Sequence, residues 1–405
     1  MANKIRGFVA LTGGTLGCLD TLTSASVANG EGAFVKKTAS DVGSILGPEI
    51  DHGALTGLGD DDHPQYVKHG LAQEENDFLI ASEEGAFVRK PLAEVHSILG
   101  LPHRNAIING NFDIWRRGTS RTSNGYGSAD RWSCAHSGTT KTASRQEFTL
   151  GQTSVPGEPA YFMRHVVTSV AGSGNYCQIR QMIEDVRTFA GQTATLSFWA
   201  KADASKNIAI EFIQSFGTGG SPSARITGIG AQKIALTTSW AKYNITVDIP
   251  SITGKTLGSD GNHCLCLYFW FDAGSDYASR TANLGQQSGT FDIAQVQLEE
   301  GSVATPFERR SYGEELALCQ RYYGVTVAMT RGYANAASTV LESQIRWHQV
   351  MRTAPSVTLT AGTRLNVAYL ALPTPTMYGV RHYLESTAAG DTYAINDTIT
   401  ADAEL

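Results

Sequence analysis

Alternating apolar and polar positions in the middle of the chain predict β-strands. Between 193 and 202, Leu196 and Phe198 alternate with Ser197 and Trp199, so one face is expected to be buried and the other wet. Gly, Ser and Asp clusters separate several stretches of this kind, which predicts a two-sheet sandwich of roughly eight to ten strands. The other stretches are 161–167, 208–214, 241–250 and 265–271.

The first hundred residues contain an internal repeat. Residues 32–47 recur as 85–100, with ten of sixteen positions identical, and each copy reads as a short strand followed by about two helical turns. Such a unit cannot bury its own apolar stripe, and two separated copies are too few to stack as a solenoid. We therefore expect a parallel homotrimer in which Phe34 and Phe87 pack against symmetry mates.

The last part of the chain begins with a helical pattern. Acidic residues open 313–323 and Arg321 lies near its end, as is typical of a short helix. The remainder, including 345–360, has strand-like stretches. The pattern predicts a small β-rich domain over 312–405.

Composition supports a mainly β protein of two or three units. The chain has 405 residues, 42 glycines and only 17% charged residues, which favours short strands with tight turns. The net charge is −6, and no Lys/Arg run exceeds a pair, so nucleic acid is not expected as a partner. The start has too short an apolar core for a signal peptide, and no eighteen apolar residues run together. We expect a soluble chain without membrane insertion.

The six cysteines show neither paired CxxC spacing nor the density of a disulfide scaffold, so they are expected to be reduced. Cys264 and Cys266 lie two apart in a strand-like run and point to one face. Burial as small hydrophobic residues is favoured there over a metal site.

Two distant segments match a known pattern. Asn109-Gly-Asn-Phe-Asp-Ile-Trp115 and 289–301 look like the two ends of one β-sandwich. With the ordered segments between them, they resemble jelly-roll carbohydrate-binding modules and the receptor-binding region of bacteriophage tail fibres. Three further segments resemble tail-fibre proteins: 11–22, 51–66 and the Glu-Leu-x-x-Cys-Gln-Arg-Tyr-Tyr run of 315–323.

The resemblance implies a trimeric tail fibre that recognises host surface polysaccharide or lipopolysaccharide. It would be made in the bacterial cytoplasm, belong to the virion tail and contact other tail proteins through its N-terminus. The alternatives are a tail-associated depolymerase and a stand-alone carbohydrate-binding accessory protein. The expected regions are virion attachment (1–50), a connector and shaft (51–104), the jelly roll (105–311) and a β-rich tip (312–405).

The resemblance also implies a structural calcium where the first and last strands meet. The matching positions are Asn111, Asp113 and Asp292. Carboxylates, an amide and backbone carbonyls are the oxygen ligands that calcium prefers. The alternative is that Asn111 and Asp113 cap turns and that Asp292 faces solvent or pairs with an arginine.

A second metal hypothesis concerns 51–69. On a three-fold axis, His52, His63 and His69 with the acidic run 60–62 would present several imidazoles and carboxylates at once. Turn-capping Asp and packed His side chains are the favoured alternative, since no His-x-His pair occurs.

Sugar binding needs aromatic platforms with flanking polar groups. Core packing is favoured for any single tryptophan, whereas loop positions favour exposure of Tyr176 and Tyr277. With Trp115, these two tyrosines are the candidate glycan-binding residues. The other aromatic candidates weighed are Trp132, Trp199, Trp240 and Trp270.

No catalytic motif is present with supporting context. The acidic pairs Glu184/Asp185 and Glu299/Glu300 are adjacent on strands, so their side chains point to opposite faces and cannot flank one glycosidic bond. We expect no catalytic residues and no enzyme activity.

Overall fold

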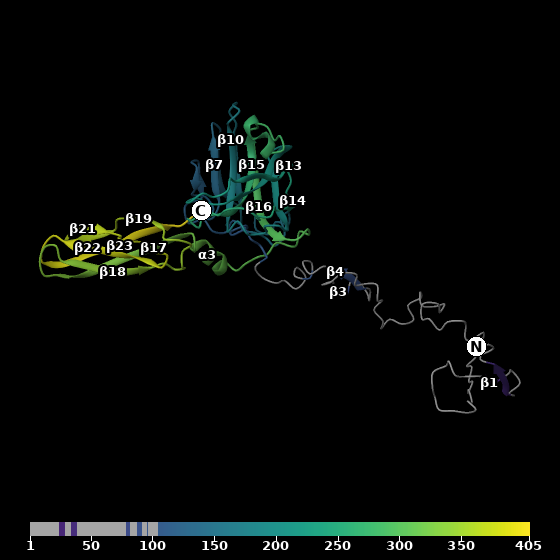
Figure 1. The fold of residues 1–405 in the computed structure, drawn as a ribbon. Coiled ribbons are helices and arrows are strands. Elements are labelled where there is room, and N and C mark those ends of the chain that lie inside the picture. Colours follow the sequence, from purple (N-terminus) through teal and green to yellow (C-terminus); the bar gives the residue numbers. More distant parts are fainter. Residues whose placement is uncertain (1–23, 29–33, 39–77, 82–86, 91–94, 96–103) are drawn as a thin grey trace. The chain divides into compact units, whose positions relative to one another are not determined.

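The computed structural model describes residues 24–28, 34–38, 78–81, 87–90, 95 and 104–405 (Figure 1). The chain divides into two compact units, 1–91 and 92–405, and each is described by itself.

The described part of the first unit consists of two antiparallel hairpins. Strand β1 (Ser24–Ala28) pairs with β2 (Phe34–Thr38), and β3 (Phe78–Ala81) pairs with β4 (Phe87–Lys90). The strand that opens each repeat is therefore present. Apart from Val95, which is helical and buried, the expected repeat helices lie outside the described residues. The homotrimer and the shaft stay predictions.

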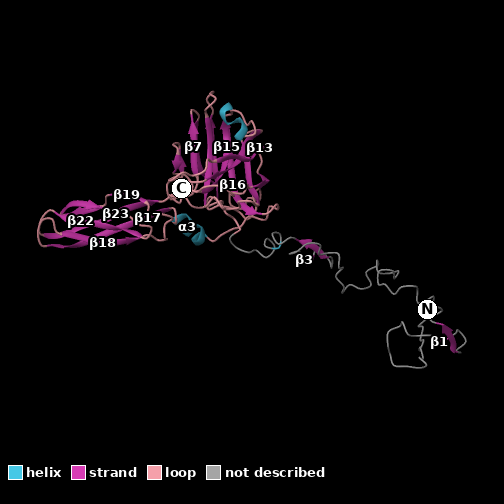
Figure 2. Cartoon of the chain, in the orientation of Figure 1, coloured by secondary structure: helices cyan, strands magenta, loops and turns pink. Residues whose placement is uncertain are grey.

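The second unit begins with a β-sandwich of two six-stranded antiparallel sheets (Figures 1 and 2). The first sheet has the order β13-β12-β15-β10-β7-β6, and the second β14-β11-β16-β9-β8-β5. The strands are β5 (Ser120–Arg121), β6 (Gly125–Tyr126), β7 (Ser133–Ser137), β8 (Thr140–Glu147), β9 (Tyr161–Thr168), β10 (Tyr176–Glu184), β11 (Thr193–Ala202), β12 (Lys206–Ser215), β13 (Ile226–Leu236), β14 (Ala241–Asp248), β15 (Cys264–Ala273) and β16 (Gly289–Glu300).

The facing sides of the two sheets form the main core. Leu196 and Phe198 of β11 are fully buried, as the alternation predicts. The Phe198 ring meets the Phe269 ring of β15 edge-on, with 5.1 Å between the ring centroids. The Trp132 ring lies 6.3 Å from the Phe269 ring on the same measure. Tight aromatic packing between the sheets holds their outer faces in fixed positions.

The two segments that resemble the ends of one sandwich do meet. The Val296 amide donates to the Gly110 carbonyl at 2.9 Å, and the Leu298 amide donates to Asn105 Oδ1 at 3.0 Å. Gly110 is required there, because a Cβ would lie 2.1 Å from the Val296 carbonyl oxygen. The mainly β sandwich is thus confirmed.

Helix α3 (Tyr312–Gln320) and a second pair of sheets follow. Ser311 caps the helix, and its backbone amide donates to the Glu314 carboxylate at 2.9 Å, which completes a capping box. One sheet has the order β17-β23-β19 with β20 beside β23, and the other has the order β18-β22-β21. The strands are β17 (Tyr323–Ala334), β18 (Val340–Arg346), β19 (Ser356–Thr360), β20 (Thr363–Leu365), β21 (Val367–Ala371), β22 (Gly379–Ser386) and β23 (Gly390–Asp402).

Cys264 and Cys266 lie side by side on the outer face of the first sheet. Both are buried, and their sulfur atoms are 3.3 Å apart, so the prediction of one shared face is confirmed. They belong to a small second core with Tyr268 and Trp270.

Among the described residues, no helix has the length and apolar character needed to cross a membrane.

Candidate functional site

The outer face of the second sheet carries the best-formed site. Ser197 and Trp199 point outward from β11, because their neighbours Leu196 and Phe198 fill the core. Opposite them the register of β16 shifts, so that Ser197 pairs with Gln297 but Trp199 pairs with Ala294. This β-bulge inserts one extra residue between the two pairs.

Gln295 lies in this bulge, with a φ of 47°. Its side chain is mostly buried, and Nε2 donates to the Pro156 carbonyl at 2.7 Å. The bulge thus joins the sheet to the 156–157 turn that forms one edge of a pocket.

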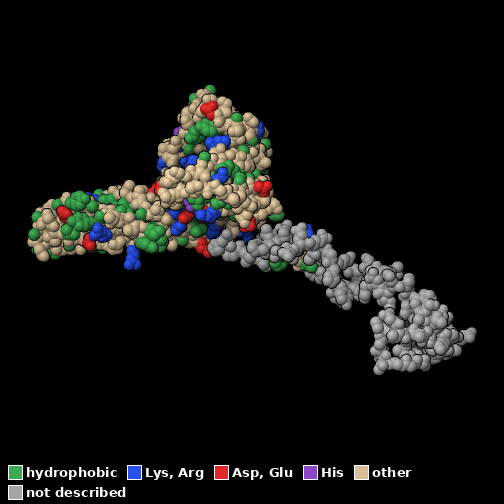
Figure 3. All heavy atoms as spheres, in the orientation of Figure 1, with side chains coloured by type: hydrophobic (Ala, Val, Ile, Leu, Met, Phe, Trp, Pro, Cys, Tyr) green, Lys and Arg blue, Asp and Glu red, His purple; other side chains and the backbone are tan. Residues whose placement is uncertain are grey.

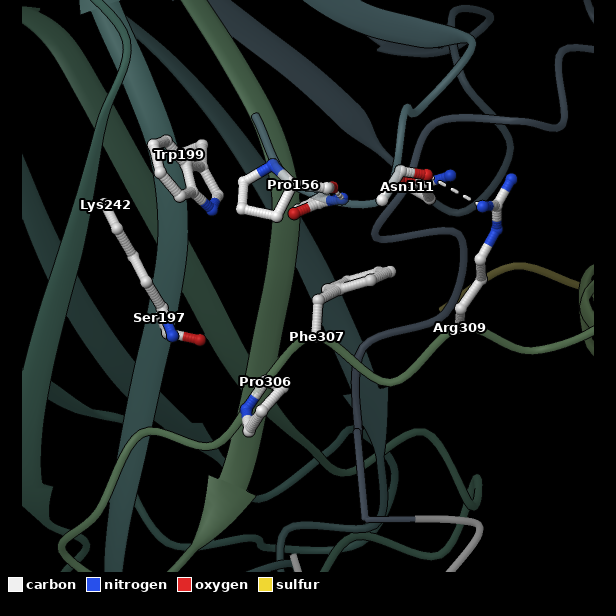
Figure 4. Close-up of a pocket in the computed structure, with 10 residues that line it drawn as sticks. Asn111, Pro156, Ser197, Trp199, Lys242, Pro306, Phe307 and Arg309 are labelled. Carbon is white, nitrogen blue, oxygen red and sulfur yellow. Dashed lines mark hydrogen bonds between the residues drawn. The ribbon is translucent and has the colours of Figure 1, made fainter. Parts of the chain in front are cut away.

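The pocket has a volume of about 300 Å³ (Figure 4). Figure 4 shows side chains of β11 and β14 on one side of it and those of Asn111 and Arg309 on the other. Its lining residues are Asn111, Pro156, Gly157, Ser197, Trp199, Lys242, Gln295, Pro306, Phe307 and Arg309. It combines two aromatic rings with amides and two cations, and no acidic side chain belongs to the lining.

Buried polar contacts hold the wall that carries Pro306 and Phe307. The Thr305 amide donates to Glu299 Oε1 at 2.9 Å, and the Thr305 hydroxyl donates to Glu299 Oε2 at 2.6 Å. Lys242 Nζ donates to the Thr305 carbonyl at 3.1 Å. Burial lowers the pKa of Lys242, and the nearby Glu299 carboxylate opposes that shift. This wall is therefore ordered without a ligand.

The opposite wall contains an unused hydrogen-bond acceptor. Asn111 Nδ2 donates to Asp113 Oδ2 at 2.8 Å, whereas Asn111 Oδ1 is buried and accepts no hydrogen bond from the described residues. Arg309 Nη1 donates to the Gly157 carbonyl at 2.8 Å. A buried acceptor without a donor is costly, so Asn111 Oδ1 would gain from any donor that reaches it.

A second group of aromatic rings lies on the second sheet. Phe148, Phe162 and Trp240 are within 5.2 Å of one another, and Lys201 Nζ lies 5.3 Å from the Trp240 ring. Lys201 leaves β11 on the same side as Trp199, two positions further on. The sheet face therefore offers further apolar and cationic surface beyond the pocket.

The three expected calcium ligands do not form one site. Asp292 pairs with Arg164 through two contacts, Nε to Oδ1 at 2.7 Å and Nη2 to Oδ2 at 2.8 Å. Asn111 and Asp113 contact each other next to Gly110, which adjoins Val296, four residues along β16 from Asp292. Within the described residues no three His, Cys, Asp or Glu side chains gather as metal ligands. For Asp292, the alternative expectation of an arginine partner is the one that the structure shows.

Trp115 does not belong to a binding surface. It is 9% exposed, packs into the main core and donates through its indole to the Phe112 carbonyl. Its assignment as a glycan platform is therefore corrected, because a sugar cannot stack on a ring that its own core covers. The hypothesis of a metal site formed by His52, His63, His69 and the acidic run 60–62 concerns residues outside the described part of the chain.

Tyr176 and Tyr277 do come together, but on the outer face of the first sheet. Their rings meet edge-on at 5.2 Å, and Tyr277 lies 5.2 Å from Trp270. The Arg280 guanidinium lies 5.0 Å from the Trp270 ring and pairs with the buried Glu211. Both tyrosines are half-buried, so the expected loop exposure is only partial.

Trp132 and Trp270 are buried, as the preference for core packing predicts. That preference is wrong for Trp199, which is half-exposed and lines the pocket. The apolar and polar alternation of 193–202 could have identified the outward position of Trp199, because it places Trp199 on the same face as Ser197. Phe307 and the 156–157 turn lie in irregular segments, and sequence reasoning missed them.

Comparisons with known proteins leave the family open. No protein-family model and no curated protein matches the chain. Among solved structures, it resembles the enzymatically active domain of tailspike protein 4 of bacteriophage CBA120, with a TM-score of 0.30 and 15% identity over 49% of this chain and 22% of that one. A family 11 carbohydrate-binding module from Clostridium thermocellum, in complex with a mixed-linked tetrasaccharide, has a TM-score of 0.27 and 13% identity over 46% and 98%.

A module described as TmCBM61, in complex with β-1,4-galactotriose, has a TM-score of 0.26 and 11% identity over 49% of this chain and 100% of that one. Because all three TM-scores are 0.30 or lower, we base the function on the residues of the site itself.

Proposed function

We propose that this protein binds glycan without turnover, as part of a trimeric bacteriophage tail fibre that recognises the host surface. The observation that carries the glycan part is the ordered pocket on the second sheet. There, the half-exposed Trp199 lines the same pocket as the amide side chains of Asn111 and Gln295, and Asn111 Oδ1 accepts no hydrogen bond from the described residues. Aromatic faces, amide groups and a free acceptor are what a pyranose ring and its hydroxyls require.

Each side chain has a separate task in this proposal. Trp199 and Phe307 provide apolar surface for the C–H face of the sugar ring. Asn111 Oδ1 accepts a sugar hydroxyl, and Lys242 and Arg309 donate to sugar oxygens. Weak binding at one such pocket would be multiplied by the three copies in a fibre.

The carboxylates near the pocket support a non-enzymatic role. Glycoside hydrolysis normally needs two carboxyl groups that flank the scissile bond. Glu299 is saturated by Thr305, and Asp292 is paired with Arg164. Burial raises the pKa of Asp113, which accepts a hydrogen bond from the pocket residue Asn111, and the lining contains no second carboxylate to act with it. We infer that the pocket lacks the pair of carboxyl groups that glycoside hydrolysis requires.

The test is binding to surface polysaccharides of candidate host bacteria, measured with the full chain and with Trp199→Ala. Loss of the aromatic platform is expected to weaken binding about tenfold or more, since truncating an aromatic anchor of a binding site typically costs about 2 kcal/mol. Tyr312→Ala, at an exposed position on α3, is the matched control and should bind as the wild type does.

Unchanged binding by Trp199→Ala would contradict the site. A reducing-sugar assay on the same polysaccharides distinguishes the alternative of a depolymerase, because only an enzyme would release new reducing ends.

A further inference from the structure

A second hollow lies in the C-terminal domain, away from the Trp199 pocket. It has a volume of about 480 Å³, which is within the range of small-ligand sites. Its lining residues are Gln344, Arg346, Trp347, Gln349, Val350 and Tyr378. Two aromatic rings, two amides and one guanidinium thus surround a single concave surface.

The backbone around this hollow is held in place. Trp347 is 9% exposed and donates from its indole to the Thr376 carbonyl at 2.8 Å. A tight turn at 376–379 presents Tyr378, whose side chain is 65% exposed. Gly379 is required at the end of this turn, because a Cβ would lie 2.2 Å from the Ile345 carbonyl oxygen. The Trp347 ring and the backbone at Tyr378 are therefore held in place by the protein itself.

The polar side chains of the hollow have no partners of their own. Gln344 and Arg346 leave β18 on the same side, two positions apart, and Gln349 follows in the next segment. Within the described residues, none of these three side chains makes a hydrogen bond or an ion pair. The neighbouring Arg381, by contrast, pairs with Glu342 at 3.5 Å. Arg346 is exposed and no acidic residue lines the hollow, so no carboxylate of the lining neutralises its charge.

We propose that this hollow is a second saccharide site, selective for sugars that carry a carboxylate or a phosphate. The exposed Tyr378 ring offers a surface for the C–H face of the sugar, and the two glutamines meet its hydroxyls. Arg346 pairs with the anionic substituent, for which a planar guanidinium is suited. The inference rests on the proposed glycan-binding function and adds to it a second site and a ligand class.

The test uses the full chain in saturation-transfer NMR with two sugar panels. The acidic panel is glucuronate, galacturonate, N-acetylneuraminate and glucose 6-phosphate, and the neutral panel is glucose, galactose and N-acetylglucosamine. Every variant is measured in a Trp199→Ala background, so that binding at the sandwich pocket does not contribute. Trp199→Ala alone is expected to retain binding of at least one acidic sugar.

Adding Arg346→Gln should weaken that acidic binding about tenfold, in line with the loss of a hydrogen bond to a charged group. Tyr378→Ala should weaken acidic and neutral sugars alike. Arg381→Gln, on β22 at the same face of the sheet but outside the hollow lining, is the matched control and should change neither.

Two outcomes would overturn the second site. One is loss of all acidic-sugar binding with Trp199→Ala alone, which would leave the sandwich pocket as the binding site. The other is unchanged acidic-sugar binding with Arg346→Gln. Failure of the sandwich site is a separate result: polysaccharide binding of the full chain would be unchanged by Trp199→Ala, while acidic-sugar binding would still respond to Arg346→Gln.

Discussion

His165 is a titratable side chain enclosed by the main core. It lies on β9, is fully buried, and its ring stacks on Phe271 at 4.6 Å. Burial, with a smaller effect of the Lys141 charge, lowers its pKa from 6.5 to about 3. The folded state therefore holds His165 neutral over a pH range in which the unfolded chain takes up a proton.

This difference predicts acid sensitivity with a defined sign. The contribution of neutral His165 to the free energy of unfolding is fully present above pH 6.5. It is lost as pH falls toward about 3, at roughly 1.4 kcal/mol per pH unit, because only the unfolded chain binds the proton in this range. His165→Phe keeps an aromatic ring and removes the titration. Urea unfolding between pH 7 and pH 4 is expected to show a flatter pH dependence for this variant than for the wild type.

His348→Gln, at an exposed position, is the control for replacing a histidine and should have the same free energy of unfolding at pH 7 as the wild type. An equal slope for His165→Phe and the wild type would show that His165 does not contribute to the acid sensitivity.

At the scale of elements, the contact between the 105–111 segment and β16 determines the shape of the sandwich pocket. Gly110→Ala places a methyl group against the Val296 carbonyl, next to the bulge residue Gln295. A loss of about 1–3 kcal/mol in the free energy of unfolding is expected from this overpacking. Thermal unfolding followed by circular dichroism would measure it.

Gly313→Ala is the matched control for this prediction. No atom lies near the added methyl group, and the position is in the first turn of α3, where alanine is the better helix former. Its unfolding temperature should be equal to or above that of the wild type. Equal destabilisation by both substitutions would contradict the packing argument at Gly110.

The sequence identified strands in which the alternation is clean. β11 is one, because its core side is apolar and its pocket side is mostly polar. β13 was missed, since Gly228 and Gly230, both with positive φ, interrupt its pattern. β15 reads as one apolar run because both its faces are buried, the outer one under the second core.

The pocket could not be predicted from local sequence patterns. Its walls come from segments far apart in the chain, around 111, 156–157, 197–199 and 305–309, and only tertiary structure brings them together. Asn111 was singled out for calcium, whereas it lines the pocket and Asp292 binds Arg164. The 109–115 motif located the region of the site correctly. The contacts of the Asn111 and Asp292 side-chain oxygens depended on tertiary packing, which the motif does not reveal.

At the scale of the whole molecule, buried charges join the sandwich to the C-terminal domain. Arg131, which is 1% exposed, pairs with Glu404, and its guanidinium lies 3.4 Å from the Tyr322 ring centroid. Arg117 contacts both Asp402 and Glu404 at 2.8 Å. Because breaking a buried pair leaves an uncompensated charge, these contacts favour unfolding of the two domains as one unit.

Assembly is predicted to depend on the first hundred residues. The repeats provide apolar strands and stripes that one chain has no means to bury by itself. Light scattering after size exclusion is expected to give three chains for the full protein and one for a chain that begins at Asn105. Three chains for both would place trimerisation in 105–405, and a single chain for the full protein would contradict the fibre hypothesis.

The bulge in β16 also bears on how this protein would change over generations. Gln295 belongs neither to the core alternation before it nor to the one after it, since Ile293 and Val296 fill the interior on either side. Replacing the residue at 295 therefore changes the pocket lining without changing the core alternation on either side. Because Gln295 has a φ of 47° and its amide holds the 156–157 turn, residues that tolerate this backbone and keep an amide, such as asparagine, would alter the ligand preference at the least cost to folding.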